Sequence, residues 1–180
     1  IDYLTIVSDG EPTLDSQLGR TIDLLRPLGL KIAVITNSSL IWSPTVREHL
    51  FKADWVSLKV DAIDENVWRE INQPHEDLQF ETIRSGICRF SEQYQGHLAT
   101  ETMLVKGLND QYVNVQQIAR FVARLNPSTA YLSVPTRPPA QSWVRPPDEE
   151  TVHQAYQTFK SSIDSVELLI GHEGDSFAST

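Results

Sequence analysis

The chain has a single cysteine, Cys88, and no long hydrophobic run among its 180 residues. One cysteine excludes an internal disulfide. No stretch approaches the roughly 20 apolar residues that a membrane-spanning helix needs, and no signal peptide is visible. We therefore expect a cytoplasmic protein with no membrane partner.

Positive charge is also scarce, because 15 Lys and Arg residues stand against 24 Asp and Glu residues and the net charge is −9. No basic run stands out, so nucleic acid is not an expected partner. The hydrophobic content of 40% and the charged content of 22% are ordinary for a globular protein. A chain of this length predicts one domain over residues 1–180.

The opening stretch 1–9 is an apolar, β-branched run, typical of a buried strand, that ends in a sharp polar turn. Gly10 predicts a backbone geometry that a residue with a Cβ resists, and Pro12 suits the first turn of a helix. Leucine and isoleucine at helical spacing then predict one helix with Leu14 on its buried face. Glu11 is predicted at the carboxyl end of a strand, where α/β folds bind ligands. The alternative is an ordinary strand–turn–helix junction with a solvated Glu.

Further apolar runs alternate with amphipathic helical patterns along the chain. The predicted strands are 31–37, 55–61, 97–105, 129–134 and 166–170. This order predicts a parallel α/β sheet with right-handed crossovers. Polar residues stand at the strand ends, namely Glu11, Asn37, Asp61, Lys106, Arg137 and His172. Polar groups from many strands at one rim favour a parallel (β/α) barrel or partial barrel over a doubly wound sheet.

The run 55–61 alternates in character, with Ser57, Lys59 and Asp61 on one face. A parallel strand that is buried on both faces should be almost wholly apolar. Three interpretations remain: an edge strand with one wet face, a Lys59–Asp61 pair that neutralises itself, or a row that points into a cavity for a polar ligand. Glu101 stands in the middle of another strand, where a carboxylate is costly unless it is paired or faces polar space.

Two other features are less regular. Residues 135–147 hold five of the ten prolines and no periodic pattern. Such a long, stiff loop is predicted to form a fixed wall or lid. Cys88 falls within a helical pattern beside Ile87, which is typical of a small side chain that fills the core.

The run Ser8-Asp9-Gly10-Glu11-Pro12 resembles the Gly-Gly-Glu-Pro motif of radical S-adenosylmethionine enzymes, in the variant with Asp at the first glycine. Ser57, Lys59 and Asp61 match a Ser/Asp-Leu-Lys pattern on the fourth strand of some members. Within that family, the stretches 71–75 and 101–107 are similar to proteins related to pyruvate formate-lyase activating enzymes.

The resemblance implies a partial barrel of six βα units, of which 1–9 would be the second strand. The next four predicted strands would be the third to the sixth, and 166–170 would be an added strand. The chain would thus be a truncated radical S-adenosylmethionine domain that begins at its second strand.

The resemblance also implies the cofactors and the residues that bind them. In the parent enzyme, a [4Fe–4S] cluster would reduce S-adenosylmethionine and generate a 5′-deoxyadenosyl radical. Glu11 and the backbone near Asp9 and Gly10 would hold the methionine ammonium, and Lys59 would meet the carboxylate or the ribose. The cofactor-binding residues would be Asp9, Gly10, Glu11, Asn37, Ser57, Lys59 and Asp61. Glu101 and Arg137 are expected to face the substrate, which is either a small molecule or a glycyl-radical-type protein.

The family's three cluster ligands form a Cys-x3-Cys-x2-Cys loop after the first strand, and that loop would precede Ile1. Cys88 alone cannot hold a cluster, since its iron needs several thiolates. The chain by itself is therefore expected to be inactive and to release no 5′-deoxyadenosine. Loss of the first strand would also leave 1–7 as an open edge, expected to pair with another chain or to be covered by a loop.

Two other functions fit the residues taken without the resemblance. Carboxylates at strand ends, namely Glu11, Asp61 and Glu101, also fit a barrel hydrolase. Lys59 close to Asp61 argues against a free acid/base pair, because it holds the carboxylate ionised. The other alternative is a binding module with no catalytic activity. The five histidines show no close ligand spacing, so no metal site is predicted from them.

Overall fold

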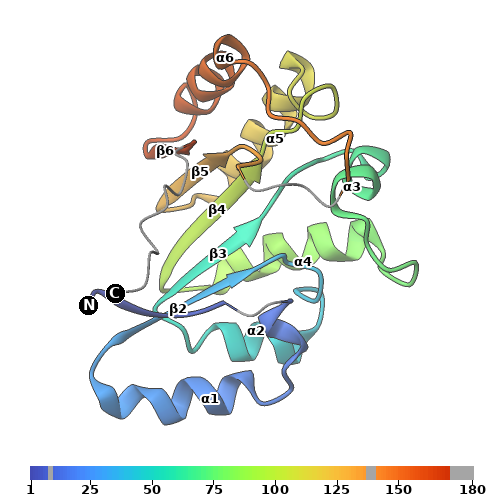
Figure 1. Ribbon diagram of the computed structural model, residues 1–180. Coiled ribbons are helices and arrows are strands. Elements are labelled where there is room, and N and C mark those ends of the chain that lie inside the picture. Colours follow the sequence, from blue (N-terminus) through green and yellow to red (C-terminus); the bar gives the residue numbers. More distant parts are fainter. Residues whose placement is uncertain (8–9, 137–140, 171–180) are drawn as a thin grey trace, which may run out of the picture.

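One parallel sheet with helices along its outer side dominates the computed structural model, which describes residues 1–7, 10–136 and 141–170 (Figure 1). The strands are β1 (Tyr3–Ile6), β2 (Lys31–Thr36), β3 (Trp55–Lys59), β4 (His97–Met103), β5 (Thr129–Ser133) and β6 (Val166–Leu169). The α-helices are α1 (Leu18–Leu25), α2 (Pro44–Leu50), α3 (Glu65–Asn72), α4 (Phe80–Gln93), α5 (Tyr112–Leu125) and α6 (Glu149–Lys160). Two short 3₁₀ helices, η1 (Pro12–Leu14) and η2 (Arg26–Leu28), flank α1.

The strand order follows the chain order. The sheet runs β1-β2-β3-β4-β5-β6, and every neighbouring pair is parallel. This confirms the predicted βα succession and the predicted open, partial barrel. Because β3 has a neighbour on each side, the interpretation of 55–61 as an edge strand is wrong.

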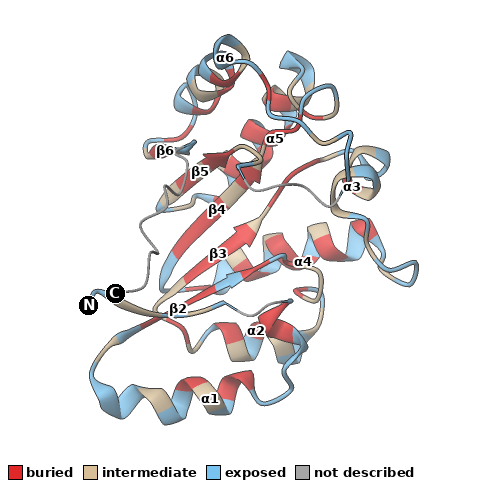
Figure 2. Ribbon diagram, viewed as in Figure 1, coloured by how far each residue is buried: buried red, intermediate tan, exposed pale blue. Residues whose placement is uncertain are grey.

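Alternation along the strands separates an outer face from an inner face. On β3, Val56 and Leu58 are fully buried under the helices, whereas Ser57 and Lys59 point to the other face. The same register continues into β4 and β5, so residues paired across strands share a face. Figure 2 shows the buried residues concentrated where the helices meet the sheet. The outer face therefore forms the hydrophobic core.

Two of the α-helices, α3 and α6, begin at an aspartate whose side chain accepts hydrogen bonds from free backbone donors of the first turn. The Asp64 side chain accepts from the backbone N–H groups of Asn66 and Val67 at the start of α3. Asp148 does the same for Thr151 at the start of α6, and the hydrogen bonds from Thr151 hold the pKa of that carboxyl below its usual value. Within the described part of the chain, none of the helices combines the length and the apolar character that crossing a bilayer requires.

Helix α4 packs unusually closely on the segment that follows β2. A Cβ built at Gly86 would lie 2.8 Å from both the carbonyl carbon and the carbonyl oxygen of Ile41. Arg47 reinforces this segment, because its guanidinium donates to the carbonyl oxygens of Ile41 and Trp42 at 2.8 and 2.7 Å. The loop between β2 and α2 is therefore held against α4 on one side and α2 on the other.

Strands β1 and β6 form the two ends of the sheet. β1 pairs with β2 on one side, and no strand among the described residues pairs with its other side. Pairing of that open edge with another chain stays a prediction. At the other end β6 pairs with β5, which confirms the strand predicted at 166–170, although β6 itself ends at Leu169.

Candidate functional site

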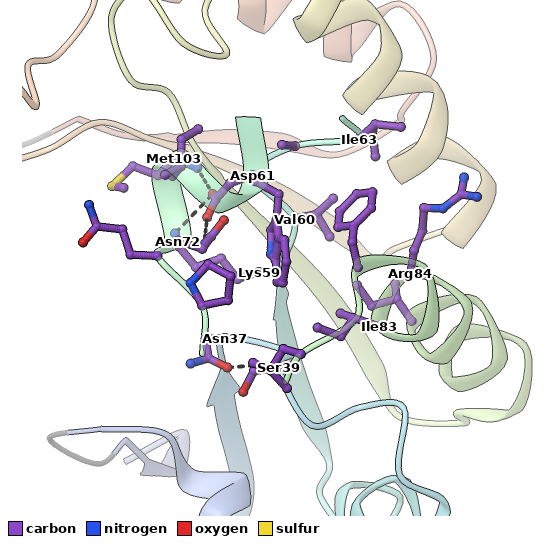
Figure 3. A pocket seen from close by; sticks show the side chains of 18 of the residues that line it. Asn37, Ser39, Lys59, Val60, Asp61, Ile63, Asn72, Ile83, Arg84 and Met103 are labelled. Carbon is purple, nitrogen blue, oxygen red and sulfur yellow. Dashed lines mark hydrogen bonds and ion pairs between the residues drawn. The ribbon is translucent and has the colours of Figure 1, made fainter. Parts of the chain in front are cut away.

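A cavity of about 430 Å³ opens at the carboxyl end of β3 (Figure 3). Its polar lining comes from three places: the ends of β2 and β3 (Asn37, Ser39, Lys59 and Asp61), the end of α3 and the segment after it (Asn72, Gln73 and His75), and α4 (Arg84). Its apolar lining comes mainly from the helices that cover the sheet: Trp68, Ile71, Leu78, Phe80, Ile83 and Ile87. The cavity can thus receive a ligand with one charged or polar end and one apolar end.

Glu11 joins the carboxyl ends of the first two strands. Its Oε1 accepts from the Thr13 N–H at 3.1 Å, the Thr13 hydroxyl at 2.7 Å and the Thr36 hydroxyl. Its Oε2 accepts from the Asn37 N–H at 2.7 Å. Glu11 is also the N-cap of η1, with Pro12 in the first turn as predicted. The carboxylate is buried, so the interpretation as a solvated Glu is wrong; Glu11 reaches the cavity through Asn37.

The two residues before Glu11 add less to the site. Asp9 lies outside the described residues. Gly10 is exposed and has no left-handed φ, and a Cβ built there would meet nothing within 4 Å. The chain bends at Gly10, but neither a positive φ nor steric crowding at this position requires glycine.

Lys59 lies between two carboxylates. Its Nζ is 3.4 Å from Asp61 Oδ1 and 3.4 Å from Glu101 Oε1. Burial alone would lower the pKa of the Lys59 ammonium, but the two carboxylates outweigh burial and raise the pKa above its usual value. The Lys59–Asp61 ion pair considered from the sequence is therefore present. Glu101 forms a second ion pair with the same ammonium.

Asp61, which follows β3, connects this strand to β4 and α3 by hydrogen bonds at the wall of the cavity. Its side chain has 0% exposure. Oδ1 accepts from the Met103 N–H at the end of β4, and Oδ2 accepts from the Asn72 side chain at the end of α3, both at 2.8 Å. A buried carboxylate with this many donors holds the strand ends in place as well as lining the cavity.

Asn109 is a residue of this rim that sequence reasoning did not identify. Its Nδ2 donates to the carbonyl oxygens of Asp61 and Met103, both at 2.8 Å, and its Oδ1 accepts from the Val105 N–H at 2.7 Å. The residue is fully buried. The signal that could have located it is the turn after β4, where Gly107 has a φ of 79° and the composition is typical of tight turns.

The remaining predicted residues lie at different distances from the cavity. Ser57 is buried on the inner face of β3, on the same side as Lys59, but it does not line the cavity. Glu101 lies on the inner face of β4, where it contacts Lys59 and accepts from the Ser133 hydroxyl at 2.9 Å. Arg137 and His172 lie outside the described residues.

The described part of the proline-rich segment, 141–147, is attached to the same rim at two points. The Lys106 N–H donates to the Arg145 carbonyl oxygen at 2.9 Å. The Gln141 side chain donates to Gln73, a residue that lines the cavity, at 3.5 Å. The segment therefore passes beside the cavity, and its role as a wall or lid stays a prediction.

The described residues contain no group of three or more His, Cys, Asp or Glu side chains arranged to hold a metal ion. Cys88 lies in α4 and packs against the hydrophobic core, as its sequence context predicted. The side chains that the structure describes therefore do not fit an iron–sulfur cluster, which is held by several thiolates.

The open six-stranded parallel sheet is the partial barrel of the radical S-adenosylmethionine fold. A domain of a pyruvate-formate lyase-activating enzyme from Bacteroides vulgatus superposes with a TM-score of 0.73 at 20% identity, covering 93% of this chain and 98% of that one. A radical SAM methyltransferase from Sphaerobacter thermophilus gives a TM-score of 0.74 at 15% identity, covering 99% of this chain and 53% of that one. At these identities the likeness shows the fold alone.

The sequence relatives include several UPF0026 proteins, a name that states no activity. The chain is 42% identical over 179 residues to the UPF0026 protein of Methanocaldococcus jannaschii, covering 98% of this chain and 56% of that protein. The chain thus spans about half the length of the curated relatives it matches. No protein-family model matches it.

Proposed function

We propose that the chain is the S-adenosylmethionine-binding part of a radical S-adenosylmethionine enzyme. The observation that carries this proposal is the gathering of Glu11, Asn37, Lys59 and Asp61 around one edge of a partial barrel. One hydrogen bond, from the Asn37 N–H to Glu11 Oε2, links Glu11 to Asn37, and Asn37 shares a cavity with Lys59 and Asp61. These side chains come from the ends of β1, β2 and β3, where parallel sheets and barrels bind ligands.

The two ends of the cavity match the two ends of the cofactor. Lys59 stays protonated because its pKa is raised, so it remains a donor and can give a hydrogen bond to a ribose hydroxyl. Asn37 uses its Oδ1 to accept from the Ser39 N–H, and its amide NH₂ has no partner among the described residues. That amide can donate to the carboxylate or to a ribose hydroxyl. The apolar lining, with Trp68 and Phe80, suits the face of an adenine ring.

The cofactor, when bound beside a reduced iron–sulfur cluster, would supply a carbon-centred radical to the parent enzyme. The part of the protein described here would bind and orient the cofactor and keep water from it. The residues that the structure describes do not supply the several thiolates that such a cluster needs. The substrate of the parent would be a small molecule or a glycyl-radical-type protein.

Titration calorimetry of S-adenosylmethionine into the chain tests the proposal. Lys59→Met keeps the length of the side chain but removes its charge, and we expect the dissociation constant to rise at least about tenfold. Lys31→Met is the matched control, because Lys31 is exposed at the opposite end of the neighbouring strand. No binding by the wild-type chain, or equal binding by both variants, would contradict the proposal.

The hydrolase alternative is not favoured by the arrangement of the carboxylates. Asp61 has no exposed side-chain surface, and each of its oxygens already accepts a hydrogen bond. Glu101 shares the Lys59 ammonium with Asp61, so each of the two carboxylates already has a cation as its partner. A glycosidase needs one of its two carboxyl groups protonated as the acid.

A further inference from the structure

The inner face of the sheet carries a second polar row next to the cavity. Four residues stand side by side in register on four consecutive strands: Lys59, Glu101, Tyr131 and Glu167. Neighbouring strands lie about 4.8 Å apart, so each of these side chains starts beside the next. On β5 the alternate residues Ala130 and Leu132 are buried toward the helices, which places Tyr131 on the inner face.

Glu101 uses only one of its two oxygens. Oε1 receives both Lys59 Nζ at 3.4 Å and the Ser133 hydroxyl at 2.9 Å. Oε2 has no hydrogen-bond or ion-pair partner among the residues that the structure describes. The side chain is 28% exposed, so a ligand on the inner face can reach it. Lys59 divides its charge between Glu101 and Asp61, so this group of three carries one uncompensated negative charge.

Tyr131 adds an aromatic ring to this charge. It is half-buried between Glu101 on β4 and Glu167 on β6. Burial, together with the neighbouring Glu167 and Tyr3, raises the pKa of the Tyr131 phenol, so the ring stays neutral at physiological pH. A neutral ring flanked by carboxylates attracts a cation through its π face as well as through the charges.

We propose that Glu101 and Tyr131 bind a primary ammonium group on the substrate, with Glu101 Oε2 accepting its hydrogen bonds. The description of this ligand as a substrate rests on the proposed function, but the ammonium site itself does not. Lys59 contacts Glu101 on one side and lines the cavity on the other. An amine-bearing substrate would therefore lie next to the ligand in the cavity, with Lys59 between them.

Binding of a simple amine to the chain tests this site directly. We would titrate n-butylammonium into ¹⁵N-labelled protein and follow the backbone amide shifts of 99–103 and 129–133. Butyrate, which has the opposite charge on a similar chain, is the control probe. We expect n-butylammonium to shift these amides and butyrate to leave them unchanged. Equal responses to the two probes would overturn the proposal.

Variants separate the carboxylate from the ring. Glu101→Gln keeps the shape of the side chain. It is expected to weaken n-butylammonium binding at least about tenfold, because a charge-assisted hydrogen bond is lost. Tyr131→Ala should weaken it by a smaller factor, and Tyr131→Phe should bind like the wild type. Glu149→Gln, at the exposed start of α6, is the matched control and should change nothing. Unaltered binding by Glu101→Gln would overturn the proposal.

The cofactor titration distinguishes this proposal from the one on which it partly rests. Glu101→Gln should bind S-adenosylmethionine at least as tightly as the wild type, because Lys59 then has one carboxylate partner fewer. A tenfold loss there would mean that Glu101 serves the cofactor's own ammonium, and this would overturn the substrate site. Failure of the wild-type chain to bind S-adenosylmethionine would remove the proposed function and leave the n-butylammonium result unaffected.

Discussion

The two faces of one sheet have opposite characters. Toward the helices, Val34, Val56 and Leu58 are completely buried and make the core. On the inner face, the neighbouring residues include Lys59 and Glu101, which form ion pairs and remain partly exposed. A strand with a period of two can serve both needs at once, because successive side chains point to opposite faces. In this protein stability depends mainly on one face, and the chemistry is assigned to the other.

Among variants that compare the two faces of the sheet, a core substitution should cause the largest loss of stability. Leu58→Ala removes a fully buried side chain from the outer face and is expected to lower the free energy of unfolding by about 3 kcal/mol. Ile35→Ala, on the inner face where Ile35 is 37% exposed, should cost about 1 kcal/mol or less. Urea denaturation of both variants measures the difference, and equal losses would mean that the inner face is buried as well.

Asn109→Ala should have the second-largest effect on stability, because the Asn109 side chain joins the carboxyl ends of β3 and β4. The substitution leaves the carbonyl oxygens of Asp61 and Met103 and the Val105 N–H without their partner. We expect a loss of about 2 kcal/mol, from the cost of buried groups that lack a hydrogen bond. Asn66→Ala, an exposed position in the first turn of α3, serves as the control, with an expected change within about 0.5 kcal/mol.

Lys59→Met should give the smallest change in stability, about 1 kcal/mol, and the only one of the three with a marked pH dependence. The folded-state pKa of Lys59 is raised above its unfolded value of 10.5. A raised Lys pKa contributes stability that is fully present below pH 10.5 and is lost as the pH rises through the folded value. The difference in free energy of unfolding between the wild type and Lys59→Met should therefore be constant from pH 7 to 10 and become smaller above that range.

Chemical denaturation at a series of alkaline pH values measures this difference in free energy of unfolding. Lys31→Met, which removes an exposed lysine at the opposite end of β2, should track the wild type throughout. If the gap between the wild type and Lys59→Met instead widens above pH 10.5, the two carboxylates do not stabilise the ammonium in the folded protein.

The strand succession could be predicted from the sequence because local patterns determine it. Apolar runs such as 31–37 and 55–61 alternate with helical patterns, and a helix between two consecutive strands allows them to lie parallel in one sheet. Glu11 could be placed at a strand end for the same reason. The helical spacing of Leu14 was misleading: Leu14 is 71% exposed, because Asp15 has an extended ψ of 108° and separates η1 from α1.

The internal contacts of the site could not be predicted, because they join residues far apart in the chain. Asn109 meets the backbone of Asp61 only after β3 and β4 have paired, and nothing at either position specifies the other. The cavity likewise depends on how α3 and α4 pack over the sheet. Side-chain pairs within one strand, such as Lys59 and Asp61, were accessible because a period of two fixes which residues share a face.

The close approach of α4 at Gly86 has a mechanical consequence for the cavity. With no space for even a methyl group between α4 and the backbone of Ile41, the helix cannot slide or rotate there without displacing the segment that carries Asn37 and Ser39. Since α4 also supplies Ile83 and Ile87 to the cavity, that part of the apolar wall must shift together with the segment that carries Asn37 and Ser39. Any widening of the cavity is therefore left to α3 and its connection to α4, residues 65–79.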